Sequence, residues 1–116
     1  MKFKRGDVVY GADPFKDGTY SRPWLIISND TQPFQGDQYI VLSLTTKTWH
    51  DGRISIADDD WLDGGTSDDS SILPWSIETL DQADIDYWQG TLSDVVVTEA
   101  VDALVTFVRS TEERSE

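Results

Sequence analysis

Apolar and polar residues alternate in several short runs along this chain, which is the pattern of β-strands with one buried face. Two runs are longer and rich in β-branched residues, and they span residues 22–28 and 38–45. The stretch Thr-Gln-Pro-Phe-Gln-Gly-Asp between them favours a turn. We therefore expect the two strands to pair antiparallel, which brings the start of the first and the end of the second to one edge of the sheet.

Three more strands are predicted, over residues 6–10, 53–57 and 71–80. Pro74 removes a backbone donor from the last of them, so we expect that strand to lie at an edge or to contain a bulge. The acidic and turn-rich residues between 58 and 71 predict a solvated hairpin, because their spacing does not match the ligand pattern of a calcium-binding loop. Residues 81–88 are predicted to form a short helical turn.

One α-helix is predicted, from Ser93 to about Arg109. Ser93 can cap its N-terminus, and Leu92 and Val97 have the spacing of a hydrophobic staple. The stripe that we expect to face the core has the spacing i, i+4, i+7 and i+11, and it consists of Val97, Val101, Leu104 and Val108. Residues 110–116 are expected to fray.

Five short strands followed by one helix predict a mainly β protein with a C-terminal helix, folded as a small, strongly bent antiparallel barrel. The 116 residues suffice for one domain, whose core we expect to span residues 4–109. The chain has no cysteine for disulfides or thiolate chemistry, and no apolar run of the roughly 20 residues that a membrane span needs. The first residues lack the apolar core of a secretory signal, so a cytoplasmic protein is expected. Five tryptophans are more aromatic surface than a small core easily hides, so we expect some of them to cover an interface.

The charge of the chain changes this picture. Asp and Glu outnumber Lys and Arg by 22 to 9, which gives a formal net charge of −13. Three explanations are open: the solvated surface of a halophilic protein, mimicry of nucleic acid or a cationic partner, and disorder. The tryptophans and the strand pattern argue against disorder, and the scattered aspartates favour halophily. At about 1 M salt the Debye length is near 3 Å, so an acidic surface does not exclude a nucleic acid as ligand.

Two polar side chains are expected at the shared edge of the two long strands. Arg22 stands at the start of one strand and Thr45 at the end of the other. A guanidinium can hold a phosphate through two hydrogen bonds, and a hydroxyl can bind a phosphoryl oxygen or a 2′-hydroxyl, so this edge is a candidate phosphate site. The residues alone leave another interpretation open, in which Arg22 forms a surface ion pair and Thr45 bonds to the backbone.

Four motifs around these strands together resemble those of the MazF/PemK family of toxin endoribonucleases. They are Lys4-Arg5-Gly6-Asp7-Val8-Val9, Arg22-Pro23 with an apolar strand ending in Ser28-Asn29-Asp30, Thr45-Thr46, and Gly90-Thr91-Leu92-Ser93-Asp94 before the helix. The resemblance implies an SH3-like antiparallel β-barrel, as in MazF and CcdB, that forms a homodimer. It also implies a toxin of a type II toxin–antitoxin system that cleaves single-stranded RNA without a metal or other cofactor and is silenced by a cognate antitoxin. By this resemblance, Arg22 and Thr45 match the catalytic arginine and threonine of the family.

Further residues are candidates for RNA binding: Tyr20, Thr46, Lys47, Trp49, His50, Arg53 and Trp75. Trp49 or Trp75 can stack on an unpaired base, which is worth about 1–3 kcal/mol per base. His50 is the only histidine, and because histidine exchanges protons near neutral pH it is also a candidate acid or base. The loop over residues 12–20, which the resemblance places beside the RNA groove, adds Lys16. For Lys16 and His50 a merely solvated side chain is an open interpretation as well.

One stretch departs from the family pattern. Some members have an Asp and an Arg in a sequence like Asp-Gln-x-Arg-Thr, and this chain has Trp75 and Glu78 at those positions. Because Glu78 reverses the local charge, two other hypotheses stay open. One is a catalytically weakened barrel that only binds RNA or an antitoxin, and the other is a toxin that acts on a protein such as a topoisomerase.

Overall fold

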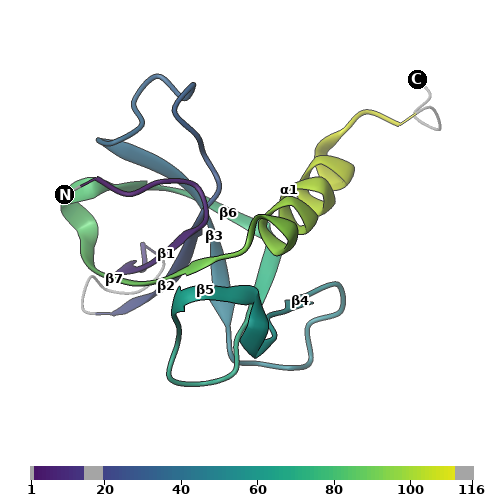
Figure 1. Cartoon of the computed structure of the whole chain (residues 1–116). Coiled ribbons are helices and arrows are strands. Elements are labelled where there is room, and N and C mark those ends of the chain that lie inside the picture. Colours follow the sequence, from purple (N-terminus) through teal and green to yellow (C-terminus); the bar gives the residue numbers. More distant parts are fainter. Residues whose placement is uncertain (1, 15–19, 112–116) are drawn as a thin grey trace.

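The computed structural model describes residues 2–14 and 20–111, which form one curled antiparallel sheet and a C-terminal helix (Figure 1). These described residues contain seven strands: β1 Asp7–Ala12, β2 Ser21–Ile26, β3 Gln38–Thr45, β4 Ile54–Ser55, β5 Trp61–Gly64, β6 Ser71–Asp81 and β7 Ile85–Leu92. The helix α1 spans Asp94–Val108, and the short 3₁₀ turns η1 and η2 span Asp58–Asp60 and Gln82–Asp84. The strand order is β4-β6-β3-β2-β1-β7-β5, and every pair is antiparallel. The predicted fold class, mainly β with a C-terminal helix, is confirmed, and the sheet curls into a half-barrel.

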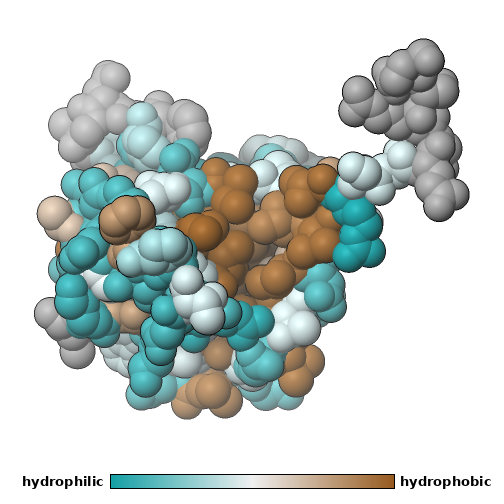
Figure 2. All heavy atoms as spheres, turned by 90° about the horizontal axis from the view of Figure 1, so that it is seen from above, coloured by the Kyte–Doolittle hydropathy of each residue, from teal (hydrophilic) through white to brown (hydrophobic). Residues whose placement is uncertain are grey.

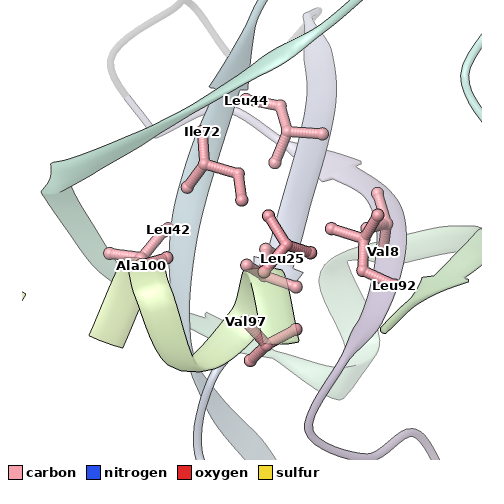
Figure 3. Packing of buried hydrophobic residues seen from close by; sticks show 9 residues of the cluster. Val8, Leu25, Leu42, Leu44, Ile72, Leu92, Val97 and Ala100 are labelled. Atoms are coloured by element: carbon pink, nitrogen blue, oxygen red, sulfur yellow. The ribbon is translucent and has the colours of Figure 1, made fainter. Parts of the chain in front are cut away.

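The central strands are buried on both faces, because successive residues of a strand point into two different cores. In β1, Val8 enters one core cluster and Val9 the other; in β2, Leu25 and Ile26 are divided in the same way. The first cluster lies between the sheet and α1 (Figure 3). Its buried members are Val8, Leu25, Leu42, Leu44, Ile72, Leu92, Val96, Val97 and Ala100. Burial on both faces explains why the two long strands read as nearly continuous apolar runs.

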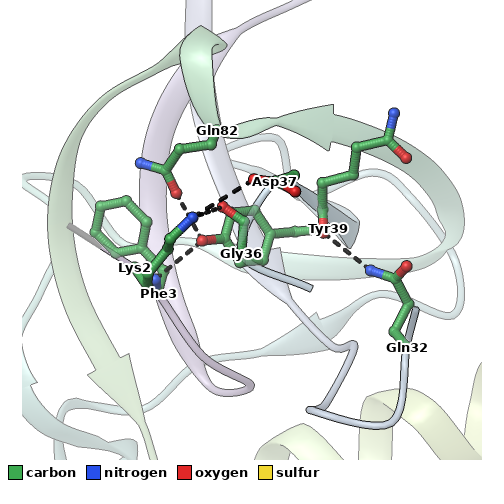
Figure 4. A network of polar contacts seen from close by, with 8 residues as sticks. Lys2, Phe3, Gln32, Gly36, Asp37, Tyr39 and Gln82 are labelled. Carbon is green, nitrogen blue, oxygen red and sulfur yellow. Dashed lines mark hydrogen bonds and ion pairs between the residues drawn. The ribbon is translucent and has the colours of Figure 1, made fainter. Parts of the chain in front are cut away.

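The second cluster is closed by polar contacts between the N-terminal segment, the loop before β3 and η2 (Figure 4). The buried Tyr39 hydroxyl accepts a hydrogen bond from the backbone N–H of Phe3 at 3.0 Å and donates one to Gln82 Oε1 at 2.6 Å. Lys2 Nζ donates to the carbonyl oxygen of Gly36 at 2.9 Å. A buried hydroxyl without partners would be costly, so this network fixes the N-terminal segment over the second core.

The helical turn predicted over residues 81–88 is wrong for most of this range, because the strand β7 begins at Ile85. Only η2 is helical there, and from Ile85 onward the chain pairs with β1 and β5. The ring of Tyr87 in β7 stacks on that of Tyr10 in β1, with centroids 5.1 Å apart. Gly90 allows β5 to approach, because a Cβ at this position would lie 2.7 Å from the carbonyl oxygen of Asp63. These contacts are all long-range, and therefore the local sequence pattern does not predict this strand.

The segment between residues 58 and 71 is also not simply the solvated hairpin that we expected. Trp61–Gly64 forms β5, and Trp61 packs half-buried against the first core cluster. The aspartates and glycines around Trp61 favour a turn when the sequence is considered alone. The contact of Trp61 with the core is what makes this segment a strand.

The strand β6 contains Pro74 but is not an edge strand, since it lies between β3 and β4. Its pairing with β3 shifts between Leu42, opposite Ile77, and Leu44, opposite Ile72. Pro74 therefore lies in a bulge, which confirms the second of the two predicted alternatives. The strand predicted over residues 53–57 shortens to the two residues of β4.

The helix α1 begins and ends within a residue of its predicted limits, with Ser93 as N-cap and Arg109 as C-cap. The Ser93 side chain makes no capping hydrogen bond; instead Asp94, in the first turn, forms an ion pair with Arg5. The predicted core-facing stripe is wrong at its end, because Val108 is 72% exposed. No helix of the described residues is long and apolar enough to cross a membrane.

Candidate functional site

Arg22 lies at the start of β2, and neighbouring elements fix its guanidinium. Nη2 donates a hydrogen bond to the carbonyl oxygen of Leu44 in β3 at 2.5 Å. Nη1 lies 3.7 Å from the carboxylate of Asp13, a buried residue directly after β1. The guanidinium also lies 5.6 Å from the ring centroid of Trp24. Arg22 is only partly exposed, so its charge is held in one place at the edge of the sheet instead of moving freely in solvent.

Thr45 ends β3 and lies beside Arg22, as the predicted pairing requires. The register that places Trp24 opposite Ser43 brings the start of β2 next to the end of β3. The hydroxyl oxygen of Thr45 accepts a hydrogen bond from the backbone N–H of Lys47 at 3.1 Å. Because that bond uses the oxygen as an acceptor, the hydroxyl hydrogen is available to donate to a ligand.

Arg22 and Thr45 line one pocket, with a volume of about 290 Å³. Its lining also includes Asp13, Tyr20, Ser21, Pro23, Leu44, Thr46, Lys47 and Ser70. Five of the nine candidate site residues thus meet in this pocket: Tyr20, Arg22, Thr45, Thr46 and Lys47. Lys16, the other candidate from this region, lies outside the described residues.

A second pocket adjoins the first and contains Arg53. It has a volume of about 380 Å³ and shares Thr46 and Ser70 with the first pocket. Its remaining lining is Thr48, Ser55, Ile56, Ala57, Asp58, Asp69 and Ser71. We call the two adjoining pockets the polar groove. It is rich in hydroxyl groups, which can donate to or accept from a ligand.

The remaining candidates form an aromatic cluster outside the polar groove. The ring centroid of His50 lies 5.8 Å from that of Trp49 and 6.3 Å from that of Trp75. Trp75 in turn meets Phe107 of α1 edge-on at 6.3 Å, and these two rings line an apolar pocket together with Asp51 and Gly52. His50 is thus not among the residues that line the pocket of Arg22.

Lys47 connects the aromatic cluster to the polar groove. Its ammonium lies 5.3 Å from the ring centroid of Trp49, while its side chain also lines the pocket of Arg22. Trp49 is 70% exposed, so its ring face is accessible for stacking.

Asp13 and Ser70 are among the groove residues that sequence reasoning missed. Asp13-Pro14 is typical of a turn, and nothing local indicates that its carboxylate turns inward toward Arg22. Ser70 belongs to an acidic, turn-rich stretch that reads as solvated. Only the long-range pairing of β6 with β3, which sets Ser71 opposite Thr45, brings Ser70 to the groove.

The residue that departs from the family pattern, Glu78, lies away from the groove. It is half-buried on β6 opposite Val41, and it lines neither the pocket of Arg22 nor that of Arg53. Trp75, in contrast, lies in the aromatic cluster. The reversed charge at position 78 therefore does not face the two groove arginines.

The cations of this acidic protein are unevenly distributed. Seven of its nine lysines and arginines lie in the part of the chain that the structure describes, and three of these seven line the polar groove: Arg22, Lys47 and Arg53. Elsewhere, Lys2 and Arg5 are paired with Asp37 and Asp94. Among the described residues, no three potential metal-ligating side chains come together.

A curled antiparallel half-barrel with one C-terminal helix, and a hydroxyl-lined groove that gathers three of the cations, define a small β-barrel protein with a candidate site for an anionic ligand. The chain belongs to the family of PemK-like, MazF-like toxins of type II toxin–antitoxin systems, whose sequence profile matches residues 4–108. Toxins of this family are endoribonucleases. The resemblance stated from the sequence motifs is thereby confirmed.

Solved structures with the same fold include several toxins. One is an endoribonuclease from a mycobacterial species in complex with its cognate antitoxin, with 22% sequence identity and a TM-score of 0.66, covering 90% of this chain and 91% of the other. Another is MazF in a MazE–MazF complex from Deinococcus radiodurans, with 12% identity and a TM-score of 0.75, covering 96% and 100%. None of the curated proteins shows a significant sequence match.

Proposed function

We propose that this protein is a toxin that cleaves single-stranded RNA without a metal ion, at the pocket of Arg22 and Thr45. The observation that supports this most directly is the gathering of three cations along one hydroxyl-lined groove of a chain with net charge −13. The lining also carries three aspartates, Asp13, Asp58 and Asp69, so the groove is balanced in charge on a strongly acidic chain. A polyanionic ligand is therefore repelled less at the groove than over the rest of the surface. Membership of the family adds the kind of reaction, and the cytoplasm, where mRNA is found, is the proposed location.

The chemistry follows from the RNA itself. The 2′-oxygen attacks the neighbouring phosphorus, the bond from phosphorus to the 5′-oxygen breaks, and the products are a 2′,3′-cyclic phosphate and a 5′-hydroxyl. The proton that leaves the 2′-hydroxyl and the proton that the 5′-oxygen gains are exchanged with water in the open pocket. The role of the protein is to stabilise the negative charge that builds up on the phosphoryl oxygens.

Arg22 and Thr45 suit this role in different ways. The guanidinium is already oriented by Leu44 and Asp13, so little reorganisation is needed when a phosphate arrives. The Thr45 hydroxyl donates its hydrogen to a phosphoryl oxygen while its oxygen stays bonded to the backbone of Lys47. Lys47 adds a second positive charge to the same pocket.

The experiment that tests this function is incubation of the purified protein with a long single-stranded RNA in molar KCl containing EDTA. We expect cuts at a recurring short sequence, with cyclic phosphate at the new 3′ ends. RNA that is bound but stays intact would instead favour the hypothesis of a barrel that only binds RNA. RNA that is neither bound nor cut, across varied sequences, would contradict both.

We further propose that the protein acts as a homodimer and is silenced by an antitoxin whose inhibitory segment occupies the polar groove in place of RNA. Apolar side chains gather in a hollow on the face seen in Figure 2. The strand β6 and the last turn of α1 carry large apolar side chains that are exposed, namely Trp75, Ile77, Phe107 and Val108. Of these, Trp75 and Phe107 meet edge-on. A second copy of the chain would cover these exposed apolar side chains.

Replacing Phe107 by aspartate is expected to convert a dimer to a monomer, because the new carboxylate would be buried against the second copy. Phe107 is 54% exposed in the single chain, so the fold of each monomer should persist. The measurement is the mass in sedimentation equilibrium at molar KCl. Val95→Asp, at a more exposed position in the first turn of α1, is the control and should leave the mass unchanged. A wild-type protein that is already monomeric at high micromolar concentration would contradict the proposal.

A further inference from the structure

The second pocket of the polar groove is built around Arg53, and it contains a donor that the protein itself leaves unused. Arg53 precedes β4, whose pairing with β6 places Ser55 opposite Ser71. Arg53 Nη1 donates to the carbonyl oxygen of His50 over a long 3.4 Å, and its Nε is buried without any hydrogen-bond partner. A buried charged donor without an acceptor is unfavourable, so the position indicates a missing acceptor.

Carboxylates of the protein do not fill that position. Asp58 and Asp69 line the same pocket, yet within the described part of the chain no carboxylate lies within ion-pair distance of Arg53. Arg22, in contrast, has Asp13 beside it. The Nε of Arg22 is likewise buried without a hydrogen-bond partner, so both groove arginines keep donors for an incoming ligand. Of the two, Arg53 is the one whose charge is not paired with a carboxylate among the described residues.

The surroundings of Arg53 suit a phosphate group that belongs to a longer strand. Hydroxyls of Thr48, Ser55 and Ser71 line the pocket and can donate to phosphoryl oxygens. The two aspartates outnumber the single arginine, so a free anion should bind weakly. A phosphate that is tethered to a strand already held by Arg22 has a high effective concentration and overcomes this repulsion.

The position of the pocket agrees with such a tether. It shares Thr46 and Ser70 with the pocket of Arg22, so a single strand can pass from one pocket directly into the other. We propose that the Arg53 pocket binds the phosphate next to the scissile one, and that the protein therefore holds two successive phosphates of its RNA. This inference rests on the proposed function, since it assumes that the scissile phosphate lies at Arg22.

The test uses a short RNA with one site that the wild-type protein cuts, and two versions in which one neighbouring linkage at a time is an uncharged methylphosphonate. The wild type should lose roughly tenfold or more in kcat/KM on one of the two versions, mainly through KM, as expected for losing a charge-assisted contact. On the unmodified RNA, the kcat/KM of Arg53→Gln should be lower than that of the wild type by the same factor. On the methylphosphonate RNA that the wild type cuts less well, the kcat/KM of Arg53→Gln should fall no further. Arg109→Gln, which removes an exposed arginine at the end of α1, is the matched control and should behave like the wild type.

The outcomes separate this proposal from the proposed function. Cleavage by Arg53→Gln at the wild-type rate, or an undiminished methylphosphonate effect in that variant, would overturn the phosphate site while leaving the ribonuclease intact. If the wild type cuts no RNA, the same three oligonucleotides are compared by fluorescence anisotropy. If Arg53→Gln then binds the unmodified RNA as tightly as the wild type does, the proposed phosphate site at Arg53 is rejected. Melting curves recorded for both variants identify a loss that comes from unfolding alone.

Discussion

Replacing Arg22 by alanine is expected to lower kcat/KM for RNA cleavage by about 10³-fold, because a preoriented cation beside a phosphate in an enzyme contributes an effect of that size. The guanidinium is held between the Leu44 carbonyl and the Asp13 carboxylate, which orients its charge toward the pocket before a phosphate arrives. The loss should appear mainly in kcat, since the charge that Arg22 stabilises builds up in the transition state. Single-turnover cleavage of a labelled RNA measures it.

Two further variants, Arg22→Lys and Thr45→Ala, test the roles of the two site residues separately. Arg22→Lys keeps the charge but cannot contact Leu44 and Asp13 with a planar fork, so we expect it to recover only part of the activity. Thr45→Ala should lose about 10²-fold, because it removes one donor to the phosphoryl oxygens. Thr106→Ala, which removes an exposed hydroxyl from α1, is the matched control and should cut like the wild type. Full activity in Arg22→Ala would place the reaction elsewhere and favour a toxin that acts on another target.

The fold is expected to depend strongly on salt, if the acidic surface is that of a halophilic protein. With a net charge of −13 on 116 residues, repulsion between carboxylates destabilises the compact state wherever the solution does not screen it. The Debye length rises from about 2–3 Å above 1 M salt to about 10 Å at 0.1 M, which lets neighbouring aspartates repel each other. We expect the melting temperature to fall by more than about 10 °C between 3 M and 0.1 M KCl, which corresponds to roughly 3 kcal/mol. Thermal unfolding followed by circular dichroism measures this.

The control for the salt dependence is a variant with less charge. Asp30, Asp59, Asp81 and Asp102 are exposed and lie outside the polar groove. Changing all four to asparagine takes the net charge from −13 to −9 and should make the melting temperature less sensitive to salt. A wild-type melting temperature that is flat from 0.1 to 3 M KCl would reject halophily. The acidity would then be explained better by a cationic partner.

The halophilic explanation also affects how RNA is bound. In molar salt the gain from releasing counterions is small, so phosphate contacts contribute less affinity than they do in dilute solution. Stacking on the exposed ring of Trp49 would then supply a larger share of it, with Lys47 connecting that ring to the pocket of Arg22. A larger contribution from stacking than from phosphate contacts agrees with a composition of few cations and five tryptophans.

The sequence by itself determines the two long strands, the helix and the edge where the site forms. The strand predicted over residues 38–45 is β3 itself, and antiparallel pairing alone is enough to bring Arg22 next to Thr45. Alternation and capping are local properties, so they can be read before the chain is folded. The family motifs are read in the same way, because they are short and contiguous.

The tertiary structure alone decides how the site is completed. The strands β5 and β7 exist because β1 and the first core cluster offer them partners, and their own residues read as turns. Asp13 beside Arg22, Ser70 in the groove and the separation of His50 from Arg22 all follow from contacts between residues far apart in the chain. Such contacts are set by the pairing register and by what each face of the sheet can bury, and no local pattern records either of these.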